Sequence, residues 1–282
     1  MTQTDIFNEQ QAAFWNGAMG QTWVDTQEIS DEMLAPAADY LVAEAKALAP
    51  RTVLDIGCGN GTTTLGIADA LPHAEEITGI DISEPMMGHA QALSEASGNK
   101  ASFVAADAAS HPYAEGHYDL IVSRFGSMFF GDQVAALRHL KSAAAPGGSL
   151  CFVVWQEPAA NSFLTVGPKA AKGLLPETPP RPEDAPSPFA MADEAKMTER
   201  LTASGWAEIS FEPVTFKFGF PERHLETFMR TIAPIGPGLD DLSEAAREAV
   251  FDKVRQAFSA YISDGRLEYD AACLVIRAKA IG

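Results

Sequence analysis

A glycine-rich turn between a short apolar segment and the start of a helix constrains the fold of this chain more than any other feature. Residues 52–56 contain a compact apolar run, which is typical of a strand covered on both faces. Three glycines follow at alternate positions, Gly57, Gly59 and Gly61, where the missing Cβ atoms let the backbone turn sharply and approach a ligand. The helix expected after Gly61 would direct its free N–H groups into this turn. The stretch therefore predicts a cofactor-binding turn in an α/β fold.

Two common kinds of glycine-rich turn do not fit these residues. A dinucleotide-binding turn needs Gly-x-Gly-x-x-Gly or Ala, and Thr62 occupies the last of those positions. A phosphate-binding loop needs Gly-Lys-Ser or Gly-Lys-Thr after four intervening residues, and the stretch contains no lysine. What remains is Asp-x-Gly-x-Gly-x-Gly, which begins at Asp55.

An acidic residue follows at the distance expected for a ribose-binding group. The second strand is expected at 77–82, and Asp81 near its carboxyl end lies 20 residues after Gly61. Acids at this spacing meet a ribose in nucleotide-binding α/β folds, and one carboxylate can accept two hydroxyl hydrogen bonds. The alternative role, a helix cap, is less favoured because Ser83 already offers a cap.

The fourth expected strand, 118–122, leads into a segment that combines a cation with aromatic residues. Arg124 follows the strand directly, and Phe125 comes next. Ligands gather outside the carboxyl ends of such strands. Arg124 could bind a substrate carboxylate or phosphate there, or it could hold a loop through a salt bridge. The sequence leaves both alternatives open.

The pattern that begins at Asp55, with Asp81 and Asp107 behind it, resembles the first motifs of the class I S-adenosylmethionine-dependent methyltransferases. The segment with Trp15 and Trp23 resembles the N-terminus of the ubiquinone- and menaquinone-biosynthesis group within that family. The resemblance implies that Asp107 receives the adenine amino group and that the backbone N–H of Ala108 meets the ring. We expect the two tryptophans to lie over the cofactor, whose sulfonium favours an aromatic face.

The resemblance covers residues 40–155 well, including Lys141 and the Pro146–Gly148 turn before the fifth strand, and covers 10–25 loosely. It is poor beyond 155, apart from the final strand pattern. It implies a Rossmann-like, doubly wound sheet of seven mostly parallel strands with a reversed last strand, in a single domain spanning 1–282.

Three segments are expected to form lids over the edge of the sheet that holds these motifs: residues 1–30, 156–192 and 219–265. The first should break between helices at Gly17 and Gly20. A helix is expected at 31–48, with Asp31 as its cap. Six prolines between 176 and 188 predict an ordered surface excursion.

The expected cofactor-binding residues come from the turn, the strand ends and the N-terminal aromatic segment. They are Asp55, Gly57, Cys58, Gly59, Gly61, Asp81, Ile82, Asp107, Ala108, Ser123, Trp15 and Trp23. The candidates for catalysis or substrate contact are His111, Tyr113, Arg124 and His224. No spacing of His, Cys, Asp and Glu suggests a metal site, so we expect none.

Net charge, hydropathy and cysteine content limit the kinds of partner and the compartment that we expect. The net charge of −18 repels phosphate backbones, so nucleic acid is not an expected partner. No apolar run approaches the length of a membrane span, and no signal peptide is visible. The three cysteines, Cys58, Cys151 and Cys273, have no paired spacing, which indicates reduced thiols in a cytoplasmic protein. We expect a monomer or homodimer.

The function implied by the resemblance is transfer of a methyl group from S-adenosylmethionine to a small molecule by in-line displacement. Two alternatives remain open: a methyltransferase-like protein that holds the cofactor or a ligand without turnover, and an NAD-dependent oxidoreductase. Neither the acceptor nor the methylated atom follows from the sequence.

Overall fold

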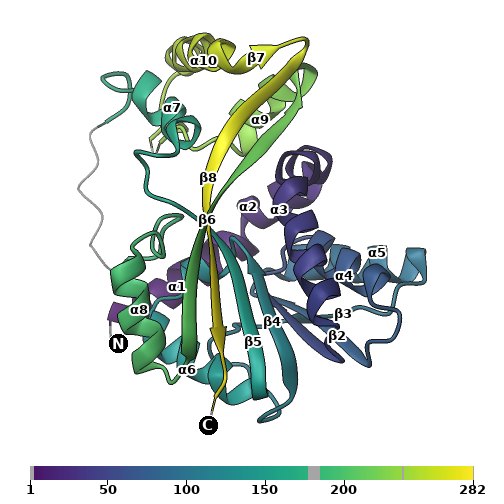
Figure 1. The fold of residues 1–282 in the computed structure, drawn as a ribbon. Coiled ribbons are helices and arrows are strands. Elements are labelled where there is room, and N and C mark those ends of the chain that lie inside the picture. The colour runs from purple at the N-terminus through teal and green to yellow at the C-terminus, as the bar shows by residue number, and fades with distance from the viewer. Residues whose placement is uncertain (1–2, 177–184, 237, 282) are drawn as a thin grey trace.

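A twisted sheet with helices on both faces forms the body of the molecule (Figure 1). The computed structural model describes residues 3–176, 185–236 and 238–281. The strands are β1 (Thr52–Ile56), β2 (Glu76–Asp81), β3 (Ser102–Ala105), β4 (Tyr118–Arg124), β5 (Ala144–Trp155), β6 (Ala207–Pro221), β7 (Ile262–Ser263) and β8 (Arg266–Lys279). The α-helices are α1 (Gln3–Asn16), α2 (Ala18–Asp25), α3 (Gln27–Leu48), α4 (Thr62–Ala70), α5 (Glu84–Ser97), α6 (Gln133–Ala143), α7 (Ser162–Ala170), α8 (Glu194–Ala203), α9 (Leu225–Thr231) and α10 (Glu244–Phe258).

The strand order confirms the predicted topology. It is β3-β2-β1-β4-β5-β8-β6, and the two-residue β7 pairs with β8 off this path. Strands β1 to β5 run parallel to one another, whereas β8 is antiparallel to both β5 and β6. The order reverses between β1 and β4, and ligands of such sheets bind outside the carboxyl ends of the strands at that point.

The helices form two layers. Helices α3, α4 and α5 cover one face of the sheet, and α6 and α8 cover the other (Figure 1). Helix α3 begins at Gln27, so the expected start at residue 31 is wrong. Its first turns carry Ile29 and Met33, which are buried and extend the apolar stripe of the helix. Asp31 therefore lies inside the helix instead of capping it.

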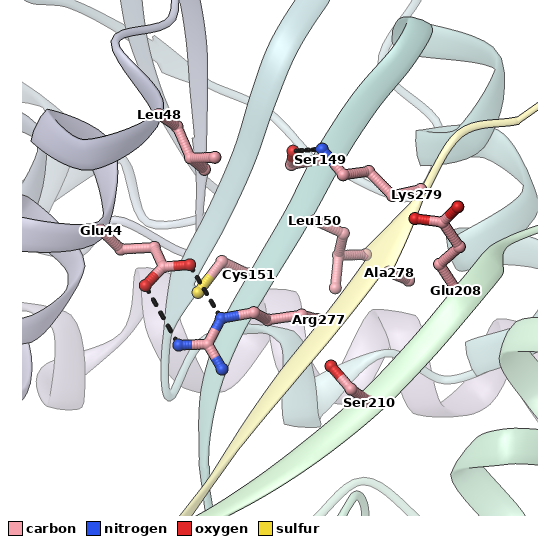
Figure 2. Close-up of a pocket in the computed structure, with 10 residues that line it drawn as sticks. All are labelled: Glu44, Leu48, Ser149, Leu150, Cys151, Glu208, Ser210, Arg277, Ala278 and Lys279. Carbon is pink, nitrogen blue, oxygen red and sulfur yellow. Dashed lines mark hydrogen bonds and ion pairs between the residues drawn. The ribbon is translucent and has the colours of Figure 1, made fainter.

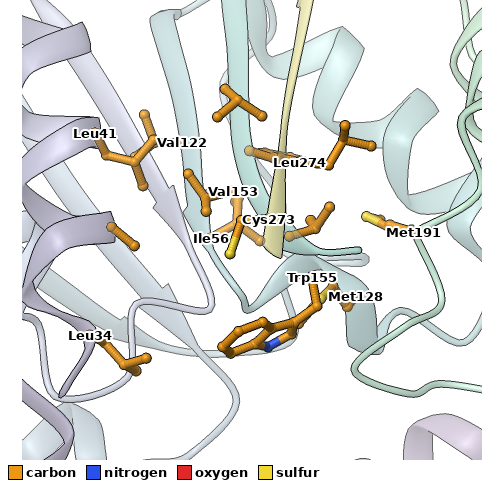
Figure 3. Close-up of a cluster of buried hydrophobic side chains, with 14 of the residues drawn as sticks. Leu34, Leu41, Ile56, Val122, Met128, Val153, Trp155, Met191, Cys273 and Leu274 are labelled. Carbon is orange, nitrogen blue, oxygen red and sulfur yellow. The ribbon is translucent and has the colours of Figure 1, made fainter. Parts of the chain in front are cut away.

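Side chains from the sheet and from α3 interlock in the core that Figure 3 shows. Leu41 of α3 lies against Val122 of β4, and Val153 of β5 pairs with Val275 of β8. Full burial of an apolar side chain of this size contributes about 1.5–3 kcal/mol. This packing fixes β1, β4, β5 and β8 as one unit whose strand ends can hold a site.

Strands β6 and β8 continue past the sheet as a ribbon that carries α7, α9, α10 and β7, a group called the cap below (Figure 1). Phe163 of α7 stacks on Tyr269 of β8, with ring centroids 3.5 Å apart. The ring of Phe163 lies 5.8 Å from that of Phe228 in α9 and 5.1 Å from that of Phe258 in α10. The cap thus unites the two separate stretches that were expected to form lids.

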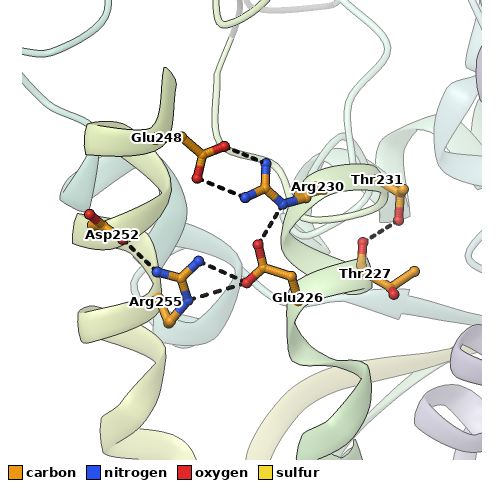
Figure 4. A network of polar contacts seen from close by, with 7 residues as sticks. All are labelled: Glu226, Thr227, Arg230, Thr231, Glu248, Asp252 and Arg255. Atoms are coloured by element: carbon orange, nitrogen blue, oxygen red, sulfur yellow. Dashed lines mark hydrogen bonds and ion pairs between the residues drawn. The ribbon is translucent and has the colours of Figure 1, made fainter. Parts of the chain in front are cut away.

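A network of charges joins α9 to α10 at the surface of the cap (Figure 4). Arg230 pairs with Glu226 and Glu248, and Arg255 pairs with Glu226 and Asp252. Every one of these side chains is at least 36% exposed, and exposed ion pairs contribute only about 0–1 kcal/mol each. The aromatic packing beneath them therefore holds the cap together.

Arg277 of β8 ties α3 to the sheet beside a shallow pocket (Figure 2). Its Nε and Nη2 donate to the two carboxylate oxygens of Glu44, over 2.8 and 3.1 Å. Nη1 also donates to Glu212 of β6 over 2.8 Å, and Nη2 to the hydroxyl of Tyr40 over 2.7 Å. This two-pronged contact stabilises α3 in its place along the sheet.

The N-terminal segment forms two helices that break at Gly17, as predicted. The second expected break is wrong, because Gly20 lies inside α2. A Cβ atom on Gly20 would come within 2.7 Å of Ser83 Oγ, so this glycine permits close packing on the turn between β2 and α5.

The described parts of the chain contain no helix that combines the length and apolar character needed to cross a membrane. The proline-rich excursion expected at 176–188 falls mostly on residues 177–184, which lie outside the described residues.

Candidate functional site

The glycine turn after β1 adopts a backbone that only glycine accommodates easily. Gly57, Gly59 and Gly61 have φ angles of +62°, +56° and +84°. A Cβ atom on Gly57 would lie 2.6 Å from Cα of Gly126, and one on Gly61 would lie 2.8 Å from the ring of Phe103. A Cβ atom on Gly59 would lie 3.8 Å from the sulfur of Met86. The outer two glycines therefore permit close packing, whereas a Cβ at Gly59 would make only an ordinary van der Waals contact.

Asp81 is held against this turn by backbone donors. Its Oδ2 accepts a hydrogen bond from the N–H of Gly59 over 3.0 Å, and its Oδ1 accepts one from the N–H of Ser83 over 2.9 Å. Burial raises the pKa of Asp81, and the backbone hydrogen bonds oppose that rise. Each carboxylate oxygen keeps a second lone pair. The group can therefore accept two further hydrogen bonds from a diol.

Asp55 lies beneath the turn and is 1% exposed. Its Oδ2 accepts a hydrogen bond from the hydroxyl of Thr64 in α4 over 2.6 Å, whereas Oδ1 is buried without a partner among the described residues. Burial raises the pKa of Asp55 to about 7, although the Thr64 hydrogen bond and the charge of Arg124 oppose the shift. Asp55 therefore positions the turn from below instead of standing at its surface.

Arg124 stands at the level of the turn, on the face of β4 that α3 covers. Asp55 pairs in register with Val122, so Arg124, two residues on, lies beside the start of the turn. Its Nη1 is buried and has no hydrogen-bond partner among the described residues. Burial lowers its pKa, and the charges of Asp31 and Asp55 oppose the shift. The salt bridge that the sequence left open is not formed among those residues.

The N-terminal helices are fastened to the site at two points. Asn16 donates to the carbonyl of Ile82 over 2.9 Å and accepts from the N–H of Glu84 over 2.9 Å. Ser83 Oγ donates to the carbonyl of Trp15. On the other side, Asn60 of the glycine turn donates to the carbonyl of Trp23 over 2.8 Å.

These contacts bring the predicted tryptophans to the turn. The rings of Trp15 and Trp23 are 6.3 Å apart, and Trp15 also lies 5.8 Å from the ring of Phe129. Trp23 and Trp15 pack beside Cys58, which is buried in a small apolar cluster with Met87. Burial raises the pKa of the Cys58 thiol, so its role there is packing.

An aromatic wall follows Arg124. Phe125 has a φ angle of +61°, which is uncommon for a residue with a Cβ atom, and its ring stacks on Trp155 at 4.5 Å. Phe218 of β6 meets Trp155 edge-on at 5.6 Å. Backbone strain of this kind collects at functional sites.

The residues expected near the adenine differ in their surroundings. Asp107 Oδ1 accepts from the N–H of Ala109 over 2.9 Å, which closes a tight turn after β3. Ala108 is buried and Ile82 is half-buried beside that end of the sheet. Ser123 is fully buried: its hydroxyl donates to the carbonyl of Ile56 and accepts from the N–H of Ser127. Ser123 therefore ties β4 to β1.

The loop candidates His111 and Tyr113 are packed together. Their rings are 5.0 Å apart, and the hydroxyl of Tyr113 donates to the carbonyl of Ala108 over 3.1 Å. Burial raises the pKa of Tyr113 far above its ordinary value. A tyrosine in this state is a poor general base.

His224 lies where β6 enters the cap. Its Nε2 is buried without a hydrogen-bond partner among the described residues, and Glu28 Oε1 of α3 is 3.6 Å away. The structure thus brings His224 to the first turn of α3, the helix that also carries Asp31.

Comparison with known proteins agrees with this geometry. Residues 53–148 match the family described as Methyltransferase domain. The chain is similar to demethylmenaquinone methyltransferase of Thermus thermophilus, with 34% identity over 115 residues that cover 41% of this chain and 52% of that protein. It is also similar to malonyl-[acyl-carrier protein] O-methyltransferase of Pseudescherichia vulneris, with 31% identity over 184 residues that cover 64% of each.

Over residues 53–148 the chain is therefore similar to methyltransferase domains. The resemblance to the methyltransferase family that the sequence predicted is thereby confirmed over these residues. The matched regions span 52% and 64% of the length of the two relatives. Magnesium protoporphyrin IX methyltransferase (ChlM) from Synechocystis PCC 6803, solved with bound SAH, shares the fold, with a TM-score of 0.56 at 17% identity over 97% of this chain and 98% of that one.

Sequence reasoning missed the roles of two polar residues around the turn. Asn60 bridges the turn to Trp23 and keeps a buried Oδ1 without a partner among the described residues. Asp31 accepts from the hydroxyl of Thr62, the first residue of α4 after the turn, and from Gln27. The position of Asn60 within the glycine stretch was a usable signal, whereas Asp31 reaches the turn only through the packing of α3 on α4.

Proposed function

We propose that this protein transfers a methyl group from S-adenosylmethionine to a small-molecule acceptor by in-line displacement. The observation that carries the proposal is the contact between Gly59 and Asp81. The 3.0 Å hydrogen bond sets a carboxylate with free lone pairs beside the turn glycine with the least crowded surroundings. A ribose bound by Asp81 would let the rest of the cofactor pass over Gly59.

The residues present fit this cofactor. Asp81 can accept from both ribose hydroxyls, and Ile82 and Ala108 offer apolar surface for the adenine. The buried Nη1 of Arg124 and Oδ1 of Asn60, which lack partners among the described residues, offer a donor and an acceptor to the polar methionine end. Trp15 and Trp23 supply aromatic faces for a sulfonium.

When bound, S-adenosylmethionine supplies a methyl group on a sulfonium, which is already a good leaving group. The chain's task is then to align the acceptor and to exclude water. Correct alignment can contribute roughly 7–11 kcal/mol of barrier lowering. Helices α1 and α2, fastened through Asn16 and Asn60, and the cap would serve as the lids that exclude water.

A general base is an optional addition, worth about 10²–10⁴-fold when the acceptor must lose a proton. Tyr113 is poorly suited because its hydroxyl is already bonded and its pKa is raised by burial. His224 is the better candidate, because its Nε2 is buried, makes no hydrogen bond to the described residues, and has the Glu28 carboxylate 3.6 Å away to support a protonated ring. Replacing His224 with Gln should lower kcat for a hydroxyl acceptor and leave S-adenosylhomocysteine affinity unchanged; a normal kcat would remove His224 from this role.

The experiment that tests the function is turnover on a set of acceptors. The purified protein is incubated with S-adenosylmethionine carrying a deuterated methyl group and with a metabolite extract or a panel of hydroxyl, amine, thiol and activated-carbon acceptors. Mass spectrometry should find S-adenosylhomocysteine and a product heavier by the labelled methyl. Cofactor binding without product formation from any acceptor would instead favour a binding protein without turnover.

The buried cysteines and the net charge of the chain support a compartment and a class of acceptor for this reaction. The three buried, unpaired cysteines support a reducing compartment, for which we propose the cytoplasm. The net charge of −18 supports a small-molecule acceptor over nucleic acid or an anionic membrane. Cell fractionation and size-exclusion chromatography would test the location and the proposed monomer or homodimer.

A further inference from the structure

We propose that Arg124 and Asp31 bind the carboxylate and the ammonium group of the methionine end of S-adenosylmethionine. This assignment rests on the proposed cofactor and names the residues that recognise its zwitterionic end. It also chooses between the roles left open for Arg124. The guanidinium binds the cofactor; it does not bind an anionic acceptor or form a structural salt bridge.

The position of Arg124 favours the cofactor. Continuing the register of β1 and β4 two residues past Asp55 and Val122 places Arg124 level with Gly57, the first residue of the turn. The ionisable groups that act most on it are Asp31, Asp55 and Cys58, and two of these belong to the turn segment. A ligand that runs from Asp81 across Gly59 therefore ends near Arg124.

The guanidinium of Arg124 has a buried donor that could bind an anion, and the described residues provide no partner for it. Nη1 is buried without a hydrogen-bond partner among the described residues. A buried donor left without a partner costs about 1–3 kcal/mol, and more when it is charged. The planar fork of arginine fits a carboxylate with two parallel hydrogen bonds.

Asp31 provides the complementary charge. Its oxygens accept from the hydroxyl of Thr62, the first residue of α4 after the turn, and from the amide of Gln27 over 2.9 Å, which fixes the carboxylate beside the turn. Each oxygen keeps a second lone pair for an ammonium group. Although the charges of Asp31 and Arg124 act on each other, the structure shows no hydrogen bond or ion pair between them. One cation and one anion held near each other but unpaired match an amino acid zwitterion.

The groups that surround Arg124 should also allow the protein to fold when this arginine is replaced by an uncharged residue. Asp55 is the other buried acid beside it, and burial raises the pKa of Asp55 to about 7. Asp55 can therefore become neutral when the neighbouring cation is removed. A methionine at position 124 should leave a folded protein.

The test compares ligands that differ only at the methionine end. S-Adenosylhomocysteine carries both charged groups, and 5′-methylthioadenosine shares its adenosine and thioether but has neither. Calorimetric titration of R124M should show a loss of S-adenosylhomocysteine affinity on the order of 10- to 100-fold, with 5′-methylthioadenosine affinity unchanged. R51M, which removes an exposed arginine just before β1, at the end of that strand opposite the turn, is the matched control and should leave both affinities unchanged.

Two further measurements separate the two charges. Decarboxylated S-adenosylmethionine lacks only the carboxylate, so R124M should not weaken its binding, whereas D31N should. R124K keeps the charge but loses the fork, so it should fall between wild type and R124M for S-adenosylhomocysteine; this variant decides the matter if R124M does not fold.

The outcomes that overturn the proposal are distinct. Equal losses for both ligands in R124M would make Arg124 a structural residue. Unchanged S-adenosylhomocysteine affinity with a raised KM for the acceptor would assign it to the acceptor. A wild-type protein that binds neither ligand would overturn the proposed function, and this inference with it, whereas wild-type binding with no ligand selectivity in R124M would overturn this inference alone.

Discussion

Replacement of Asp81 is the perturbation whose effect on cofactor binding the structure defines best. The carboxylate accepts from the N–H groups of Gly59 and Ser83 over 3.0 and 2.9 Å, which leaves one lone pair on each oxygen for a ribose hydroxyl. Alanine at position 81 removes these charged acceptors and frees the Gly59 N–H. The expected loss of S-adenosylhomocysteine affinity is about 1–3 kcal/mol, or roughly 5- to 150-fold in Kd.

The assay must separate lost affinity from lost stability. Asp193 caps α8 by accepting from the N–H of Lys196 over 3.0 Å, on the side of the sheet away from α3. D193A should cost about 1 kcal/mol of stability, measured by urea unfolding, with no change in affinity. Calorimetry on D81A and D193A then isolates the ribose contacts. Wild-type affinity in D81A, or an equal loss in D193A, would refute the reasoning.

Three further perturbations have defined outcomes. G59A should still fold, at a cost of about 1–3 kcal/mol for its φ of +56°, because the added Cβ would have only a methionine sulfur at 3.8 Å, but it should lose S-adenosylhomocysteine affinity. G57A should destabilise the fold more, because its Cβ would also lie 2.6 Å from a backbone carbon. Because burial raises the pKa of Asp55 to about 7, against about 3.9 in the unfolded chain, its protonated form stabilises the fold at low pH and that stability is lost as pH rises from about 4 through 7. Replacing Asp55 with Asn should therefore flatten the pH dependence of Tm between pH 5 and 8, and an unchanged slope would assign the dependence to another group. F163A should destabilise the cap by about 3–5 kcal/mol, because it removes the ring that stacks on Tyr269 and contacts α9 and α10; limited proteolysis of the cap at an unchanged rate would contradict this.

Local sequence patterns predicted much of the fold, because strands, turns and helix starts each favour particular residue types over short stretches of the chain. The apolar run at 52–56, the glycine triplet and the acid at position 81 are consecutive signals, and the structure brings them together at one edge. The break at Gly17 follows in the same way. The parallel order of the first five strands follows from the alternation of strands and helices, which the family resemblance reinforced.

What the sequence did not reveal depends on contacts between distant segments. Gly20 looks like a helix breaker, but it lies within α2 because its missing side chain lets the helix approach Ser83. Asp31 looks like a helix cap, but α3 begins earlier and carries it to Thr62. Asn16 reaches Ile82 across 66 residues, a pairing that no local pattern encodes.

In the candidate site, too, some residues could be recognised from the local sequence and others only from tertiary packing. The turn and Asp81 were accessible from the sequence, whereas the buried, unpaired Nη1 of Arg124 became visible only with the burial around it. The cap is the part least accessible to prediction. Its two stretches, on either side of β6, meet through the rings of Phe163, Phe228 and Phe258, and only tertiary packing brings those rings together.

Calorimetric titration of the wild-type protein with S-adenosylmethionine and with NAD tests the central claim most directly. We predict saturable one-to-one binding of S-adenosylmethionine and no binding of NAD, because Thr62 replaces the third glycine or alanine of a dinucleotide site and Asp81 accepts a hydrogen bond from Gly59. Saturable NAD binding with no detectable affinity for S-adenosylmethionine would contradict it.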